Sequence, residues 1–319
     1  MFSIEDSIKL RESLSPFEFN GPSNLNDLAH AYCEHYGLSF DQNLPLQSHR
    51  IGLLRSGDFD LVCQHFSVSL EQQRGTVFLV HGYFDHTGLY GHLIKHCLQQ
   101  GLSVIAFDLP GHGLSSGPQA SIDSFNQYSD ALSRIISEAE YQQVNKPWFA
   151  IGQSTGAATI VNGIIEKKFP LREFEQSIFL APLVYPKHWT RTRFLFAAVR
   201  WFISSTRRNF ASNSHDQEFL NFLRNSDELQ SKKLPREWVI SMLDYHRRLR
   251  RFETIDCPVS IIQGTDDQTV EWGRNIKQLE TKFSGVKTYL INGGRHHLVN
   301  ESQEFRDAVF SLIDQIIEQ

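Results

Sequence analysis

One serine, two neighbouring carboxylates and two neighbouring histidines stand in an order that suits nucleophilic catalysis. Ser154 lies in the run Gly152-Gln153-Ser154-Thr155-Gly156, and the pairs Asp266-Asp267 and His296-His297 follow it along the chain. A serine hydroxyl attacks an ester at neutral pH only when a base takes its proton and an acid orients that base. The order serine, acid, histidine is typical of a nucleophile held on a strand-turn-helix elbow. From the residues alone, either member of each pair can be the functional one, and the other can be a capping or surface residue.

The elements that must position these residues are strands that alternate with helices. The sequence predicts a hairpin of extended stretches over 49–54 and 60–68, and then strands over 76–80, 103–107, 148–151, 177–180, 258–262 and 288–291. It predicts helices over 25–36, 89–100, 121–140, 157–168, 272–283 and 304–317, with Ser124 and Gln127 as a capping box. This alternation indicates a mostly parallel sheet covered by helices on both faces.

Acyl transfer also requires donors for the oxyanion that forms on the substrate carbonyl. One donor is expected from the residue after the nucleophile, and a second from the loop that follows an early strand. Thr155 supplies the first N–H. Tyr83, directly after His81-Gly82 at the end of the strand 76–80, supplies the second.

Four blocks of the sequence resemble one family. The run from His81 to Tyr90 is similar to the HGxxEHSGRY block of monoacylglycerol lipases and bacterial lysophospholipases, the serine-aminopeptidase-like branch of the α/β-hydrolases. The run from Phe107 to Ser115 looks like the branch's DxxGHGxS block. Gly264 with Asp267 and Val270 is similar to its GxxDxxV acid block, and His296 with Glu301 to its HxxxxE block. The resemblance implies that Asp267 is the acid and His296 the base, and that the substrate is a lysophospholipid or a monoacylglycerol-like lipid.

The chain departs from the family pattern beside the nucleophile. Asp85 stands in place of the usual Glu and Leu89 in place of the usual Arg, and Gln153-Ser154-Thr155 replaces the commoner His-Ser-Met. None of these changes removes a catalytic group. They bear on the identity of the substrate, because residues next to the nucleophile shape the acyl pocket.

The resemblance implies an α/β-hydrolase fold, and the break in the strand-helix rhythm implies an insertion. We expect residues 1–182 and 256–319 to form the hydrolase core and residues 183–255 to form an inserted, mainly helical lid. The stretch 176–215 has no acidic residue. Its cations are Lys187, Arg191, Arg193, Arg200, Arg207 and Arg208, and its interleaved aromatics are Tyr185, Trp189, Phe194, Phe196, Trp201, Phe202 and Phe210.

Two interpretations of this basic, aromatic stretch remain open. The lid can offer apolar surface to an acyl chain and positive charge to an anionic headgroup or a membrane surface. Alternatively, its aromatics pack on the core while its arginines are solvated. A second basic run, 247–251, is expected to be a solvated helix face rather than a nucleic-acid site, because no recognition motif accompanies it.

Composition limits the remaining function classes. The chain has 319 residues, of which 40% are hydrophobic and 21% charged, with a net charge of −5. This balance does not favour a nucleic-acid partner. No metal-ligand spacing and no phosphate loop is found, so we expect no cofactor. The four cysteines are scattered, and the N-terminus has no signal-peptide pattern, so we expect a cytoplasmic protein.

The sequence thus predicts a serine hydrolase that cleaves carboxylic esters through an acyl-enzyme. An esterase, amidase or aminopeptidase-like enzyme acting on small soluble substrates is the alternative within the enzyme class, because the same triad performs all these reactions. Outside that class, the fold can serve as a binding module without catalysis.

Overall fold

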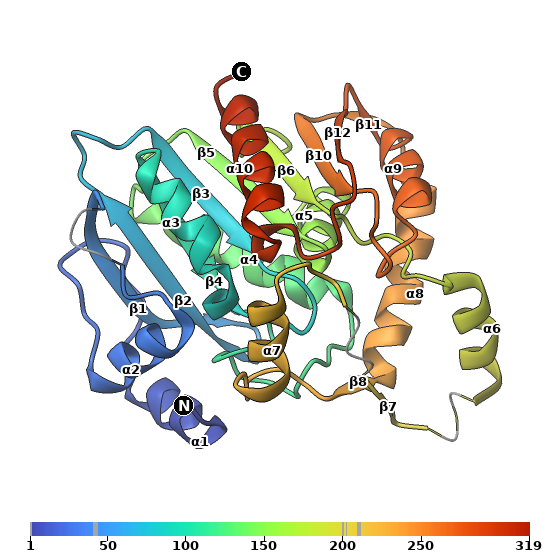
Figure 1. Ribbon diagram of the computed structural model, residues 1–319, viewed down its shortest axis with the longest axis horizontal. Helices are drawn as coiled ribbons and strands as arrows, with labels where there is room; N and C mark the ends of the chain where they lie inside the picture. The colour runs from blue at the N-terminus through green and yellow to red at the C-terminus, as the bar shows by residue number, and fades with distance from the viewer. Residues whose placement is uncertain (1, 41–43, 200, 202, 209–211) are drawn as a thin grey trace.

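The computed structural model places an eight-stranded sheet at the centre of the molecule (Figure 1). It describes residues 2–40, 44–199, 201, 203–208 and 212–319. In spatial order the strands are β1 (Leu46–Ser56), β2 (Phe59–Val68), β4 (Leu102–Phe107), β3 (Gly75–Val80), β5 (Trp148–Gln153), β6 (Gln176–Leu180), β10 (Val259–Gly264) and β12 (Lys287–Ile291). The hairpin β1–β2 joins β4 in antiparallel fashion, and all later pairs are parallel. The alternating pattern correctly predicts this mostly parallel sheet.

The central strands are apolar on both sides because helices cover both faces of the sheet. Every residue of β3, β4, β5 and β10 is buried, as expected for parallel strands inside a sheet. One core packs α4 (Phe125–Tyr141), α5 (Thr155–Ile165), α8 (Arg236–Arg251) and α9 (Trp272–Glu280) against one face. The other core packs α2 (Asp27–Tyr36), α3 (Gly91–Gln99) and α10 (Gln303–Ile317) against the opposite face.

Local sequence signals account for most element boundaries. The expected capping box forms at α4, where the Ser124 side chain accepts from the backbone and Gln127 reciprocates. The helix expected over 89–100 begins instead as a short 3₁₀ turn, η1 (Thr87–Tyr90), and continues as α3. The N-terminal region, expected to hold one helix, has a second one: α1 (Ile4–Ser13), with its own capping box at Ser3 and Asp6.

Segment 183–255 leaves the sheet after β6 and returns at β10, although these two strands are neighbours. It contains α6 (Trp189–Val199), β7 (Ser205–Arg207), α7 (Gln217–Asn225), β8 (Lys233–Pro235) and α8, and its strands pair only with each other. β9 (Ile255–Asp256) follows and pairs with β11 (Phe283–Ser284). In Figure 1, α6 lies at the right edge of the view and α7 below its centre, with α8 between them.

The aromatics of this segment divide between core and surface. Tyr185, Trp189 and Phe196 are buried in the first core, whereas Phe194 and Trp201 are 66% and 75% exposed. Packing on the core and exposure of apolar surface therefore both occur. Arg200, Phe202 and Phe210 lie outside the described residues. Within the described part of the chain, no helix is long and apolar enough to cross a membrane.

The turn from β5 to α5 depends on glycine for space. A Cβ on Gly156 would lie 1.9 Å from the Val80 carbonyl oxygen, and one on Gly152 would lie 2.5 Å from the Ala157 nitrogen. Both are backbone atoms that cannot move aside as a flexible side chain can. The first turn of α5 can therefore pack against β3 only because these two side chains are absent.

We predict that Gly156→Ala lowers the free energy of unfolding by about 1–3 kcal/mol or more, the range for forcing atoms into a packed interior. Gly273→Ala is the matched control, because Gly273 lies in the first turn of α9 and its Cβ would meet nothing within 4 Å. The control should be neutral or slightly stabilising, since alanine favours helix. Urea unfolding of both variants checks this, and equal effects would contradict the steric argument.

Candidate active site

The nucleophile candidate stands on a strained turn. Ser154 has φ +53° and ψ −107°, an uncommon conformation for a residue other than glycine, and it connects β5 directly to α5. Its N–H donates to the Leu180 carbonyl (2.8 Å), and its own carbonyl accepts from Leu183 (3.2 Å) and Ala158 (3.1 Å). These bonds to the end of β6 and to the helix hold the turn in its strained form. The Ser154 side chain is thereby presented at the carboxyl edge of the sheet.

An acid and a base meet at the same edge. Asp267 follows β10, His296 follows β12, and His296 Nδ1 lies 2.7 Å from Asp267 Oδ2. The loops that carry them are pressed together, because Asp266 N–H donates to the Gly294 carbonyl and a Cβ on Gly264 would lie 2.2 Å from that same oxygen. Ser154 and His296 line the same cavity, and the buried Asp267 contacts His296, so the structure brings the three residues together from three different strand ends.

The Asp267 carboxylate is fully buried and held by four donors. It accepts from the N–H groups of Thr269 (2.7 Å) and Val270 (3.1 Å), from Gln263 Nε2 (3.1 Å) and from His296. Burial opposes its charge, but these interactions outweigh burial and keep the pKa of Asp267 below its usual range. Burial likewise opposes the protonated form of His296, but the adjacent carboxylate raises the pKa of His296 above its ordinary value. The ionised Asp267 is therefore suited to stabilise the protonated, imidazolium form of His296.

The other two members of the ambiguous pairs have different surroundings. Asp266 has a side chain that is 51% exposed, with Arg295 Nε at 3.7 Å. His297, in contrast, is buried, and its Nε2 lies 3.1 Å from Asp85 Oδ2. His297 is the N-cap residue of the short 3₁₀ turn η2 (Leu298–Asn300), and its side chain is buried rather than at the surface. Adjacent histidines point to two different buried carboxylates.

The Asp85–His297 pair supports the loop that holds the second expected oxyanion donor. Tyr90 hydroxyl donates to Asp85 Oδ2 (3.0 Å) and accepts from the Gly82 N–H (2.9 Å). Burial opposes the charge of Asp85, but His297 and the other partners hold the pKa of this carboxyl well below its usual range. A chain of hydrogen bonds therefore runs from a charged carboxylate to the backbone immediately before Tyr83. The sequence marked Asp85 only as a departure from the motif, and gave no sign of this pairing.

Both expected oxyanion donors line the cavity that contains Ser154. Thr155 is the first residue of α5, so its N–H has no acceptor within the helix and is available to a ligand. Tyr83 is fixed through its side chain, which donates to the Ala120 carbonyl (2.6 Å) and stacks on Trp238 with ring centroids 4.0 Å apart. Its backbone N–H therefore has a defined position at the cavity wall.

Gln153, the residue before Ser154, contacts the backbone of the candidate base His296. Its side chain is fully buried, and Nε2 donates to the His296 carbonyl at 2.9 Å. The sequence identified Gln153 as a departure from the family's histidine and as a residue that shapes the pocket. The contact with the His296 backbone shows a further role that spacing alone does not reveal.

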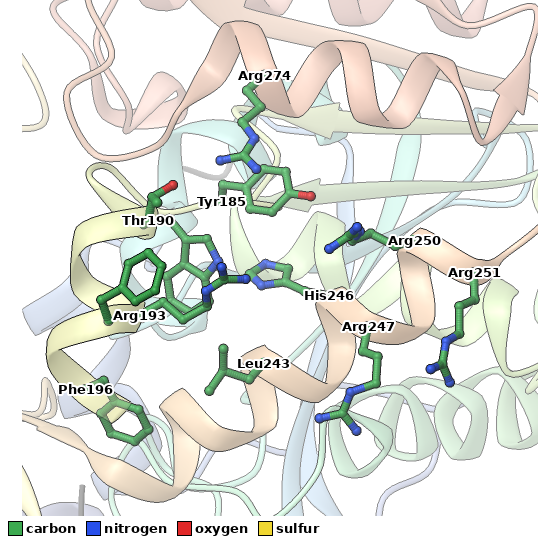
Figure 2. Close-up of a pocket in the computed structure, with 12 residues that line it drawn as sticks. Tyr185, Thr190, Arg193, Phe196, Leu243, His246, Arg247, Arg250, Arg251 and Arg274 are labelled. Carbon is green, nitrogen blue, oxygen red and sulfur yellow. The ribbon is translucent and has the colours of Figure 1, made fainter. Parts of the chain in front are cut away.

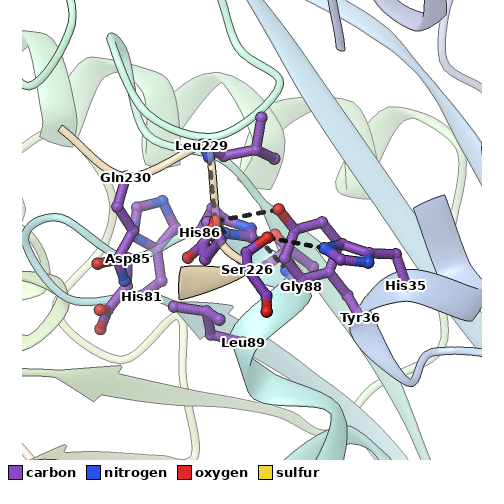
Figure 3. Close-up of polar contacts among 12 residues, drawn as sticks. His35, Tyr36, His81, Asp85, His86, Gly88, Leu89, Ser226, Leu229 and Gln230 are labelled. Atoms are coloured by element: carbon purple, nitrogen blue, oxygen red, sulfur yellow. Dashed lines mark hydrogen bonds and ion pairs between the residues drawn. The ribbon is translucent and has the colours of Figure 1, made fainter. Parts of the chain in front are cut away.

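A third buried histidine–carboxylate pair connects the loop after β3 to segment 183–255 (Figure 3). His86 Nε2 lies 3.3 Å from both carboxylate oxygens of Asp227, and Tyr36 hydroxyl donates to Asp227 at 3.0 Å. Asp227 also accepts from the Leu229 N–H at 3.0 Å. Helix α2, the loop after β3 and the segment after α7 therefore converge on one carboxylate. Position in the sequence gives no indication that residues 36, 86 and 227 meet.

The cavity itself has a volume of about 240 Å³ and a largely apolar wall. Its apolar side chains are Leu183, Pro186, Trp189, Leu220, Leu223, Leu234, Trp238, Val239 and Val270. Most of these belong to segment 183–255, which therefore lies over the sheet edge that carries Ser154. Two arginines, Arg208 and Arg224, also line the cavity, and its one acidic side chain among the described residues is the engaged Asp85. No group of three or more potential metal ligands is present among the described residues.

These features define an α/β-hydrolase with a serine elbow. The chain belongs to the serine aminopeptidase S33 family, whose model matches residues 71–303. It is 24% identical to human monoglyceride lipase over 255 residues, which cover 77% of this chain and 83% of that protein. It is 23% identical to a monoglyceride lipase homolog of Monkeypox virus over 264 residues, covering 81% and 94%.

Solved structures show the same fold. A soluble variant of the monoglyceride lipase of Saccharomyces cerevisiae, in complex with a substrate analog, superposes with a TM-score of 0.74 at 18% identity, covering 88% of this chain and 97% of that one. The monoacylglycerol lipase of Paleococcus ferrophilus superposes with a TM-score of 0.67 at 22% identity, covering 81% and 98%.

The buried His86–Asp227 pair gives a pH-dependent prediction. Burial opposes both charges, but each partner favours the other's charged form, so the pKa of His86 is raised and that of Asp227 lowered. The contribution of His86 is lost as pH rises through its raised pKa, and that of Asp227 is lost as pH falls through its lowered one. The pair therefore stabilises most between about pH 4 and pH 6.5, the ordinary pKa values of the two groups.

We predict that Asp227→Asn lowers the free energy of unfolding at pH 6 by about 3 kcal/mol, because it leaves a buried partner uncompensated. This loss of unfolding free energy should become smaller at pH values above the pKa of His86, because the histidine is then neutral. Urea unfolding at pH 6 and pH 8.5 measures both values. Glu228→Gln, an exposed neighbour, is the control and should change little. A loss independent of pH would show that the ion pair does not contribute.

Proposed function

We propose that this protein hydrolyses carboxylic esters of single-chain lipids through an acyl-enzyme on Ser154. The observation that carries the proposal is the 2.7 Å contact between His296 Nδ1 and the buried Asp267, in a cavity that Ser154 also lines. An orienting acid, a base and an elbow serine are the parts that such chemistry requires. Family membership supports the same reaction class, because the relatives include monoglyceride lipases.

The residues have the following roles in this mechanism. His296 takes the Ser154 proton as the hydroxyl oxygen attacks the ester carbonyl, and it later gives that proton to the leaving alcohol. Asp267 fixes the Nδ1–H tautomer of His296 and stabilises the imidazolium. The N–H groups of Tyr83 and Thr155 stabilise the oxyanion. Removal of one such donor typically lowers kcat by about 10²–10³-fold. Water, activated by the same histidine, then hydrolyses the acyl-enzyme.

The cavity favours a lipid with one acyl chain. Its volume of about 240 Å³ lies just below the range of about 300–1,000 Å³ for ligand pockets, so two chains do not fit. The apolar wall suits an acyl chain, and the cationic Arg224 suits an anionic headgroup at the polar side. The combination of apolar and cationic lining residues therefore fits a lysophospholipid better than an uncharged monoacylglycerol.

We propose that segment 183–255 is a lid. It supplies much of the apolar wall of the cavity, and its strands β7 and β8 pair with each other rather than with the central sheet. The exposed Phe194 and Leu195 on α6 suit contact with a lipid surface. The core would then comprise residues 1–182 and 256–319. The four cysteines are free and buried, which supports our assignment of the protein to the cytoplasm.

An ester hydrolase of small soluble substrates is the competing function, and the modest size of the cavity favours it. Aminopeptidase activity has less support. A free α-amino group is cationic and needs a carboxylate partner. The only acidic side chain among the described lining residues, Asp85, is already paired with His297 and Tyr90.

Labelling with a fluorophosphonate tests the nucleophile and the ambiguous pair together. We expect the wild type to be labelled and Ser154→Ala not to be. Asp267→Asn should lower kcat by about 10⁴-fold, because His296 loses its orienting acid. Asp266→Asn, the neighbouring exposed carboxylate, should change kcat by less than about threefold. Equal labelling of Ser154→Ala would overturn the nucleophile, and a larger loss at Asp266 would overturn the choice of Asp267 as the acid. No labelling of the wild type would favour a non-catalytic protein.

A series of glycerol and p-nitrophenyl esters of increasing chain length tests the substrate class. Each methylene buried in the apolar wall contributes about 0.8 kcal/mol, so kcat/KM should rise roughly fourfold per carbon until the cavity is full. At equal chain length, a lysophospholipid with an anionic headgroup should exceed the monoacylglycerol. Activity confined to acetyl and propionyl esters would contradict the lipid assignment and support the small-ester alternative.

A further inference from the structure

A second, larger cavity lies outside the proposed catalytic cavity. It has a volume of about 700 Å³ and opens between α6, α8 and α9 (Figure 2). We call it the arginine groove. Its cationic side chains are Arg193 of α6, Arg247, Arg250 and Arg251 of α8, and Arg274 of α9. Two helices of segment 183–255, α6 and α8, and one helix that follows it, α9, therefore bring guanidinium groups to the arginine groove.

The positive charge of the arginine groove is hardly compensated. Among the described residues that line it, none is acidic. Arg247 has a carboxylate partner, Asp244, at 3.2 Å. Arg248 of the same basic run belongs to a different environment, because it pairs with Glu166 (2.7 Å) and Asp244 (2.9 Å). The other four arginines of the groove form no ion pair with any residue that the structure describes.

Gathering five like charges costs free energy, so an unneutralised cluster of this kind points to an anionic ligand. Arginine is suited to that role, because its planar fork donates two parallel hydrogen bonds to a phosphate or carboxylate. The expectation of a simple solvated helix face does not describe α8 fully. Three of its arginines line a hollow together with arginines from two other helices.

The wall of the groove is aromatic and holds one arginine in place. Tyr185 lies under the Arg274 guanidinium, with its ring centroid 3.8 Å from Cζ. Stacking leaves the edge N–H donors of that guanidinium directed away from the ring and available to a ligand. In Figure 2, Tyr185 and His246 lie between Arg274 and the arginines of α8.

His246 adds a buried polar atom without a partner. Its Nε2 donates to the Val184 carbonyl, so Nδ1 is an acceptor in the neutral ring. Burial lowers the pKa of His246 to about 4, which keeps the ring neutral at physiological pH. Nδ1 is buried and has no hydrogen-bond partner among the described residues. His246, a residue of the groove wall, therefore keeps an unused hydrogen-bond acceptor.

We propose that the arginine groove is a binding site for a phosphate group, distinct from the catalytic cavity. The ligand is a phosphate monoester or diester, carried either by a lipid headgroup or by a small soluble molecule. The rim of the groove favours the lipid, because Phe194 and Leu195 on α6 are 66% and 63% exposed beside it. The site does not depend on the proposed hydrolysis, since none of its arginines lines the cavity of Ser154.

Binding to vesicles and to a soluble phosphate tests the site. All proteins carry Ser154→Ala, so that lipids are not consumed. The groove variant is Arg193→Gln with Arg274→Gln. The matched control is Arg191→Gln with Lys277→Gln, which removes two charges from the same two helices at exposed positions outside the groove. Ligands are vesicles of phosphatidylcholine alone, vesicles containing phosphatidylglycerol, and glycerol 3-phosphate.

At about 1 kcal/mol for each cation, the groove variant should bind phosphatidylglycerol vesicles roughly 30-fold more weakly, while the control stays within about threefold of the parent. Thermal unfolding by circular dichroism checks that both variants fold. Binding of glycerol 3-phosphate without vesicle binding supports the site and assigns it to a soluble ligand. Equal losses in the two variants, or no binding to any phosphate ligand, would overturn the proposal.

Discussion

The strained backbone of Ser154 is the constraint on which the site depends. A positive φ at a residue other than glycine costs about 1–3 kcal/mol and persists only where its surroundings fix it. Here the end of β6 accepts a hydrogen bond from the Ser154 N–H, and the first turn of α5 donates one to the Ser154 carbonyl. The close packing of Gly156 against the Val80 backbone also fixes the turn. Because α5 begins immediately after the strained residue, the Thr155 N–H belongs to the first turn of the helix and has no acceptor within it.

Around that turn, charge is organised by two neighbouring histidines that face different acids. His296 contacts Asp267 and His297 contacts Asp85, so one short loop after β12 contacts both the loop after β10 and the loop of Tyr83. In each pair the favourable charge interaction outweighs burial for the acid, which remains ionised. A displacement of this loop would therefore disturb the base and the loop of Tyr83 together.

The sequence predicted the sheet and its edge well, because those features follow from local patterns. Buried strands such as β3 and β5 are continuous apolar runs, and the capping box at Ser124 is a short-range signal. The pairs Asp85–His297 and His86–Asp227 could not be predicted, because they join residues 212 and 141 positions apart, and no periodicity encodes such contacts. For the same reason the basic run 247–251 resembled a solvated face. The other walls of the arginine groove come from α6 and α9, and only folding brings the arginines of the three helices together.

Trp189 connects the two cavities of the molecule. It is buried, it lines the cavity of Ser154, and it also lines the arginine groove, where it packs against His246 with ring centroids 4.8 Å apart. The indole is thus a single wall between an apolar chamber and a cationic hollow. A packed interior transmits displacement because it has few voids into which a side chain can yield. A ligand that orders α6 against α8 would therefore also fix the Trp189 face that an acyl chain contacts. In that arrangement, segment 183–255 would link binding of an anionic group at one side of the indole to the shape of the catalytic cavity at the other.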